Sequence, residues 1–369
     1  MSETRGGSAA DLVDFSLASR ICARALGRSV PLPADVAKRL EIDALSLTRS
    51  AYERVSAATG LVSPEGSPRA LVLDRMGWAE ANISSLGELL TKVDQPAQRG
   101  VATTHATTHA ITRASSGTQV GLMFAWLSRH VLGQYDMVTG DPERDGIYYV
   151  GSNIYGLERR HGFAPSEFRL WIALHEVTHH LQFSGVPWMR AYFFDLIKRA
   201  SAIGATNSQT FAEARSRAME IIRRGENPLH EGGIAALLAG TKLFETMREA
   251  QALMSLLEGH AEYVMSVTAP DSIPGAKRFA SVLRERREQG SPVAKFVQQA
   301  LGFEAKLRQY HEGHAFIDFI VDAGGPELIA LLWQARENIP DIEEIREPSR
   351  WIARIDGGSS RADNPHALS

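Results

Sequence analysis

The segment LHEVTHHLQF, residues 174–183, places two histidines four residues apart around a glutamate, in the pattern H-E-x-x-H. This spacing matters because residues four apart project from the same face of an α-helix. Pro165 suits the first position of a helix, Glu167 suits its first turn, and the sequence SGVP at 184–187 supplies a stop. We therefore predict a helix over residues 165–184 with the motif near its middle.

On such a helix, His175 and His179 can bind one metal ion through their imidazole nitrogens. Glu176 is rotated by one residue, so its carboxylate lies beside the ion, where it can act as a general base. His180 points away from the face of the other two histidines and is interpreted as a neighbour only. The competing interpretation is a helix with structural histidines, but the amphipathic surroundings of the motif favour a metal site.

A zinc ion held by two histidines needs a third protein ligand and an open position. The chain has one cysteine, Cys22, which excludes an intrachain disulfide and a thiolate cluster. The third ligand must therefore be a histidine or a carboxylate. Two segments that share the sequence E-G-H-A compete for this role, LLEGHAEY at 256–263 and YHEGHAFIDF at 310–319.

We favour Glu258 as the third ligand, because Glu262 lies one turn later on the same helix face. There Glu262 could accept the second ring N–H of a ligating histidine and fix its orientation. The later segment offers Phe316 where this second carboxylate would be needed. The alternatives to Glu258 are His260, Glu312 and His314.

Stabilisation of a developing oxyanion would need one more polar side chain near the ion. Tyr310 is the candidate for this catalytic role, because it shares a predicted helix face with a histidine four residues later. That histidine, His314, could share the role, and the rivals are Tyr263 and His230.

The composition is that of a globular protein without a nucleic-acid or membrane partner. In 369 residues, 44% hydrophobic residues suffice for the core of one large domain or two smaller ones. A net charge of -3 gives no extended positive field for nucleic acid or anionic lipid. The first residues, MSETRGGSAADLVDF, lack the apolar block of a secretion signal. We expect a soluble, cytoplasmic protein.

Helical periodicity dominates the chain and predicts a mainly α fold with one small β-sheet. Strands are predicted for RALVLD at 69–74 and GIYYVG at 146–151. We expect an N-terminal helical layer at 1–100, a metal-binding core at 101–355 and a disordered tail at 356–369. Helices are predicted over residues 9–27, 34–59, 75–93, 104–133, 165–184, 188–203, 208–224, 241–268, 274–289 and 303–322.

The segments EFRLWIALHEVTHHLQFSGVPWMR and LLEGHAEYVM resemble the zincin-like metallopeptidase family of actinobacteria and their relatives. Members of that family are labelled as hydrolases associated with biosynthesis of a deazaflavin coenzyme. The resemblance continues in LVLDRMGWAEANISS, SRHVLGQYD and KLRQYHEGHAFIDFI, and so covers nearly the whole chain. It implies a mostly helical zincin-like fold, with zinc held by His175, His179 and Glu258 and with Glu176 as the base.

The segment EGHAEY is also similar to the N-E-G-F-A segment of gluzincin aminopeptidases, in which the glutamate before the glycine binds zinc. In this chain a longer stretch separates His179 from Glu258 than in those enzymes. A helical insertion would have to fill it.

The expected function is zinc-dependent hydrolysis of an amide bond in a peptide or protein substrate. In zincins an edge strand before the active-site helix aligns the substrate, and GIYYVGSN at 146–153 stands in that position. The alternative is a non-catalytic protein that keeps a structural zinc and binds a peptide or protein partner. A fourth protein ligand on the ion would favour this alternative, because a catalytic ion needs an open position.

Overall fold

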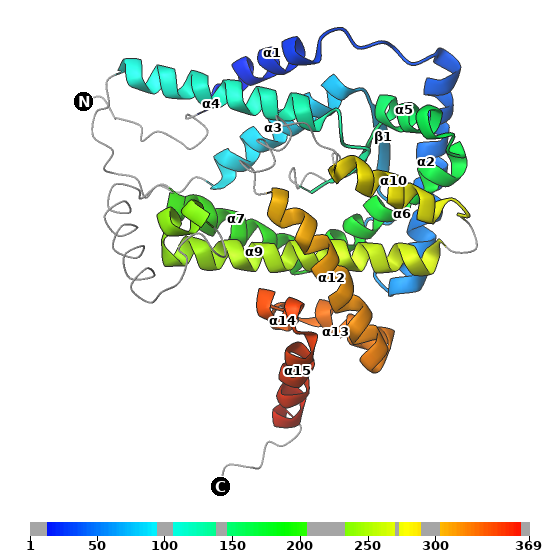
Figure 1. The fold of residues 1–369 in the computed structure, drawn as a ribbon, viewed down its shortest axis with the longest axis vertical. Coiled ribbons are helices and arrows are strands. Elements are labelled where there is room, and N and C mark those ends of the chain that lie inside the picture. Colours follow the sequence, from blue (N-terminus) through cyan, green and yellow to red (C-terminus); the bar gives the residue numbers. More distant parts are fainter. Residues whose placement is uncertain are drawn as a thin grey trace. The chain divides into compact units, whose positions relative to one another are not determined.

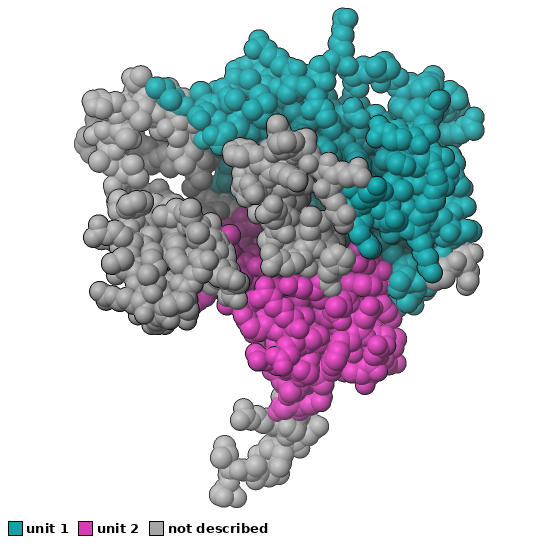
Figure 2. All heavy atoms as spheres, in the orientation of Figure 1, with its two compact units in different colours: residues 1–185, 264–303 teal, residues 186–263, 304–369 magenta. Residues whose placement is uncertain are grey.

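The computed structural model describes residues 13–93, 106–137, 146–204, 233–269, 273–288 and 303–362. These residues form a mainly α-helical structure with one three-stranded sheet, as the sequence predicts (Figure 1). The chain divides into two compact units, which Figure 2 shows in different colours. Unit 1 consists of Met1–Gly185 and Val264–Phe303, and unit 2 consists of Val186–Tyr263 and Glu304–Ser369.

This division does not follow the predicted boundary near residue 100. In unit 1, α4 (Ala106–Leu127) packs against α1 (Phe15–Leu26) and α3 (Arg75–Val93). Helices from both sides of the predicted boundary therefore share one core. The other helices of unit 1 are α2 (Ala34–Thr59), α5 (Gly151–His161), α6 (Pro165–Ser184) and α10 (Ala276–Glu288).

Small residues bring α4 close to α1. A Cβ atom on Gly117 would lie 2.5 Å from the Asp14 carbonyl oxygen, and one on Gly121 would lie 2.5 Å from the Ala18 carbonyl oxygen. Both glycines therefore serve a contact inside one chain, between α1 and α4. Only residues without a side chain allow two helix backbones to approach so closely.

The sheet has the strand order β1-β3-β2. The strand β1 (Arg69–Leu73) pairs in parallel with β3 (Gly146–Val150), and β2 (Gly133–Asp136) pairs with β3 in antiparallel fashion. The prediction that the segment at β3 is an edge strand is therefore wrong. The short segment GQYD forms β2 and covers that edge. The predicted helix over 104–133 included only its first residue, Gly133, and α4 ends at Leu127.

The central strand β3 is buried along its whole length and contacts different helices on its two faces. Tyr148 and Val150 belong to a core that includes Trp78 of α3 and Phe124 of α4. The next side chain, Tyr149, points to the other face, where its hydroxyl lies 2.7 Å from the Thr48 hydroxyl of α2. Since α2 also packs against α6, the sheet lies between two helical layers.

The motif helix α6 has the predicted bounds, Pro165–Ser184, with the proline in its first turn. A buried ion-pair network attaches it to the surrounding helices. Arg169 donates hydrogen bonds of 2.7 and 2.8 Å to Glu158 of α5 and one of 2.6 Å to Asp43 of α2. These bonds satisfy charges that would be costly to bury alone, and they fix the start of α6.

Unit 2 contains α7 (Met189–Gly204), which matches a predicted helix, and most of α9 and α12. The long helix α9 (Gly233–Thr268) begins in unit 2, and its last residues from Val264 onward belong to unit 1. The predicted helix 208–224 lies outside the described residues. The remaining elements are α12 (Phe303–Gly324), α13 (Pro326–Gln334), η2 (Arg336–Asn338), α14 (Ile342–Arg346) and α15 (Pro348–Ala362).

The end of the chain corrects one prediction. Helix α15 continues to Ala362, so disorder from residue 356 is wrong for 356–362. Among the described residues, no helix combines the length and the apolar character needed to cross a membrane.

Candidate metal centre

His175 and His179 face each other on α6 as the motif predicts. Their Nε2 atoms lie 3.2 Å apart, and the two rings are nearly perpendicular, at 86°. Two nitrogens bound to one tetrahedral zinc at about 2.0–2.1 Å would be separated by about 3.3–3.4 Å. The observed separation therefore fits two imidazoles that share one ion.

Glu258 is grouped with these histidines as a possible metal ligand. In the part of the chain that the structure describes, one ligand atom from each of His175, His179 and Glu258 lies within 4.8 Å of the others. Glu258 is 8% exposed. A buried carboxylate is costly without positive charge nearby, and two imidazoles with one carboxylate form a donor set typical of catalytic zinc. The residues present thus fit a zinc ion.

The second E-G-H-A segment has different contacts. Glu312 of α12 lies 3.4 Å from the guanidinium of Arg346 in α14, which supplies it with a counter-ion. His314 lies with Nε2 3.3 Å from Asp318 and with Nδ1 3.8 Å from Glu262. Of the two glutamates that the sequence offered as ligands, only Glu258 belongs to the group with the motif histidines.

The remaining histidine of the first E-G-H-A segment, His260, is an aromatic packing residue. Its side chain is 1% exposed and lies edge-to-face against Trp333, with ring centroids 4.9 Å apart. His260 is absent from the group of candidate ligands among the described residues. Its neighbours instead indicate a role in the core of unit 2.

The sequence pattern did not identify the outer partner of His179. His179 Nδ1 lies 2.9 Å from Oε1 of Gln182, a completely buried residue three positions later on α6. The predicted partner, Glu262, is 41% exposed at its side chain and lies near His314. The hydrogen-bond partner of His179 Nδ1 is therefore Gln182. That Glu262 orients a ligating histidine stays a prediction, and it can apply only to His175. The three-residue spacing from His179 to Gln182 was the signal that could have identified this contact.

Glu176 is held at the outer edge of strand β2. The backbone N–H of Tyr135 donates a 3.1 Å hydrogen bond to Oε2 of Glu176, which is 8% exposed. A Cβ atom on Gly133 would lie 2.6 Å from Cγ and 2.8 Å from Oε1 of Glu176. The glycine therefore leaves the space that this carboxylate occupies.

His180 faces away from the motif histidines, as predicted. Its Nε2 lies 3.2 Å from the Gly66 carbonyl oxygen, and its ring lies edge-to-face against Tyr135. The side chain of Tyr310 and all of His230 lie outside the described residues, so the catalytic role considered for them stays a prediction.

Two tyrosines near these elements have shifted pKa values. Burial raises the pKa of Tyr149 well above its ordinary value; the hydrogen bond with Thr48 opposes this shift and the charge of Glu176 adds to it. In unit 2, burial and the neighbouring Asp318 raise the pKa of Tyr263. Both phenols are therefore hydrogen-bond donors at neutral pH and do not supply negative charge.

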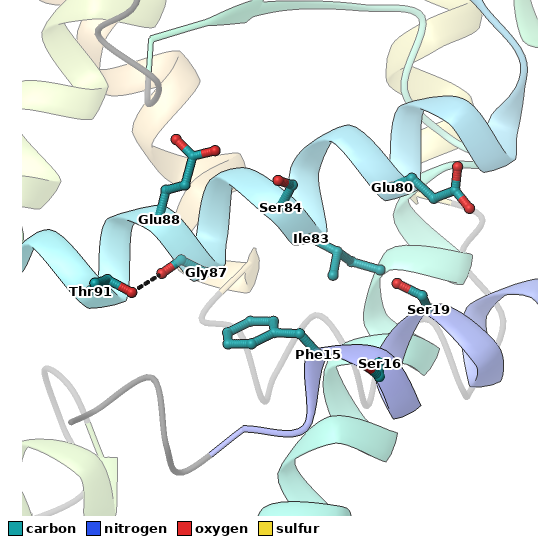
Figure 3. Close-up of a pocket in the computed structure, with 9 residues that line it drawn as sticks. All are labelled: Phe15, Ser16, Ser19, Glu80, Ile83, Ser84, Gly87, Glu88 and Thr91. Carbon is teal, nitrogen blue, oxygen red and sulfur yellow. Dashed lines mark hydrogen bonds between the residues drawn. The ribbon is translucent and has the colours of Figure 1, made fainter. Parts of the chain in front are cut away.

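One hollow in unit 1 is not part of this centre. It has a volume of about 600 Å³ and lies between α1 and α3, with Phe15, Ile83 and Glu88 among its lining residues (Figure 3). None of the predicted metal ligands or the predicted base lines it. Its size alone does not make it the reactive site, because it contains no metal-binding donor set.

Comparison with known proteins adds an independent line of support. The family model for zincin-like metallopeptidases matches residues 13–352. This chain belongs to the zincin-like metallopeptidase family. A crystal structure from Chloroflexus aurantiacus, named in provisional terms as a hydrolase with a novel fold, superposes on this zincin-like protein with a TM-score of 0.69. The two chains are 25% identical over 93% of this one and 99% of the other.

No curated protein matches this zincin-like chain. The family and the similar structure support a hydrolase at a coarse level, and the family implies a metal cofactor. Neither comparison refers to a deazaflavin coenzyme, so that association stays a prediction.

Proposed function

We propose that this zincin-like protein is a zinc-dependent metallopeptidase that hydrolyses an amide bond in a peptide or protein. The observation that carries the proposal is the pair of Nε2 atoms 3.2 Å apart on α6, grouped with the carboxylate of Glu258.

His175, His179 and Glu258 would hold the ion and leave a coordination position for water or substrate. A bound zinc ion supplies Lewis acidity, which polarises the scissile carbonyl and acidifies water. Glu176 takes a proton at Oε1, while the Tyr135 N–H fixes Oε2 and with it the direction of the carboxylate. The same carboxyl group then delivers the proton to the leaving amine.

The strand that could align a substrate is not the one that the sequence suggested. Because β3 is central, the edge strand beside α6 is β2. Its outward backbone N–H at Tyr135 already bonds to Glu176. We propose that a peptide backbone aligns along the remaining backbone groups of the β2 edge, beside the Glu176 carboxylate.

The test combines metal analysis with peptide-library cleavage by the full-length protein. We expect one zinc per chain in the wild type and in Glu176→Gln, because Glu176 is not a ligand. Cleavage should fall by about 10²–10⁴-fold in Glu176→Gln, the usual contribution of a general base. Unchanged cleavage in Glu176→Gln would refute the assigned base. Stoichiometric zinc with no cleavage by the wild type would favour the non-catalytic, partner-binding alternative.

A further inference from the structure

Gln182 stands out because its side chain bonds to the ring nitrogen of His179 that faces away from His175. It is completely buried, and its Oε1 lies 2.9 Å from His179 Nδ1. The other ring nitrogen, Nε2, faces His175 Nε2 at 3.2 Å. The two nitrogens of His179 are thus directed at two different partners.

An amide oxygen can only accept a hydrogen bond, so it selects the form of His179 that carries its proton on Nδ1. That form presents a lone pair at Nε2, which is the arrangement a metal ligand requires. A single bond therefore sets both the tautomer and the orientation of the ring.

The partner is an amide and carries no charge. A carboxylate in this position would also fix the ring, but it would add negative charge beside the ion and raise the basicity of the histidine. A neutral acceptor fixes the ring and leaves the ion more electrophilic. With Glu258 as the single charged ligand, the centre keeps a net positive charge when a divalent ion is bound.

We infer that Gln182 is the positioning residue of the metal centre: it fixes His179 in the Nδ1-protonated form without adding charge. This inference rests on the proposed function, since it assigns His179 as a metal ligand. Gln182 acts only through His179 and has no role in the proton transfer assigned to Glu176.

Three variants test it in the full-length protein. Gln182→Met keeps most of the volume and removes the acceptor, Gln182→Glu keeps an acceptor and adds charge, and Gln182→Asn withdraws the amide by one methylene. Gln119→Met is the matched control, because Gln119 is a helical glutamine with a side-chain bond to Ser115 of 3.3 Å on the exposed face of α4.

Competition with a chelator of known affinity measures zinc binding. The dissociation constant for zinc should rise about 10–100-fold in Gln182→Met and Gln182→Asn. It should stay equal or fall in Gln182→Glu and stay unchanged in Gln119→Met. Equal affinity in wild type, Gln182→Met and Gln182→Asn would overturn the inference and leave the proposed function intact.

A second readout needs no metal and would not respond to a merely structural role. Long-range ¹⁵N–¹H spectra of the metal-free protein distinguish the two histidine tautomers. His179 should show the Nδ1-protonated pattern in the wild type and lose it in Gln182→Met. An Nε2-protonated His179 in the wild type would overturn the inference. A wild type that binds no zinc would instead overturn the proposed function, and the metal role of Gln182 with it.

Discussion

Gly259 of α9 lies directly against Gly313 of α12, so that a Cβ atom on Gly259 would collide with the carbonyl group of Gly313. From the other helix, a Cβ atom on Gly313 would collide with the carbonyl oxygen of Ser255 in α9. These are the glycines of the two E-G-H-A segments. The two segments therefore cross at their shared sequence, and Glu258 and Glu312 each stand one residue before the crossing.

Alanine at either crossing glycine should destabilise the protein. Since backbone atoms are in the way, Gly259→Ala and Gly313→Ala should each lower the free energy of unfolding by about 1–3 kcal/mol or more, measured by urea denaturation. Gly156→Ala in α5 is the control, because its Cβ atom would meet nothing within 4 Å. In a helix that change should stabilise by about 0.5–1 kcal/mol. A stabilising effect at Gly259 or Gly313 would contradict the crossing.

The two glutamates beside this crossing should differ in their effect on zinc. Glu258→Gln should weaken zinc binding by more than the roughly 10–100-fold expected for an outer partner, because a ligand charge is lost. Glu312→Gln should leave zinc binding unchanged and cost at most about 1 kcal/mol, since it breaks only the partly exposed pair with Arg346. Chelator competition measures the first effect and urea denaturation the second. Loss of zinc in Glu312→Gln alone would reverse the assignment.

The local features of α6 could be predicted from the sequence, because they depend on neighbours along the chain. Pro165, the stop signal SGVP at 184–187 and the four-residue spacing of His175 and His179 all act within or next to one helix. The sequence favoured Glu258 over Glu312 as the third ligand but did not decide between them. The ion pair of Glu312 is made with Arg346 of α14, and sequence patterns do not reveal such a distant partner.

The strand β2 could not be predicted for a different reason. Its four residues, GQYD, are too short and too polar to show the alternation typical of strands. It forms because β3 offers an edge and because Tyr135 donates to Glu176. Consequently the edge strand was assigned to the wrong segment, and the contact that orients the proposed base was missed.

Gly133 should be needed for peptide cleavage and not for zinc binding. The methyl group of Gly133→Ala would displace the Glu176 carboxylate, and a shift of about 1 Å in a catalytic group can cost about 10²-fold in rate. We expect that loss in peptide cleavage, with zinc content unchanged. Gln134→Ala is the control in the same strand, because the Gln134 side chain donates a hydrogen bond to Asn82 and not to Glu176. Equal cleavage by wild type and Gly133→Ala would show that Glu176 is not held as proposed.

The start of the motif helix should depend on Arg169. Its side chain and that of Glu158 are 9% and 4% exposed, so Arg169→Met leaves a buried carboxylate without its counter-ion. Breaking a buried pair from one side costs about 3–5 kcal/mol, and we expect a loss of this size in urea denaturation of the metal-free protein. The double variant Arg169→Met/Glu158→Leu should recover part of the loss, because both charges are then gone.

Arg39→Met is the control. The ion pair of Arg39 with Asp35 spans 3.9 Å and its side chains are 75% and 69% exposed, so the free energy of unfolding should change by at most about 0.5 kcal/mol. If Arg169→Met and Arg39→Met had equal effects, the network would not be what anchors α6 to α2 and α5.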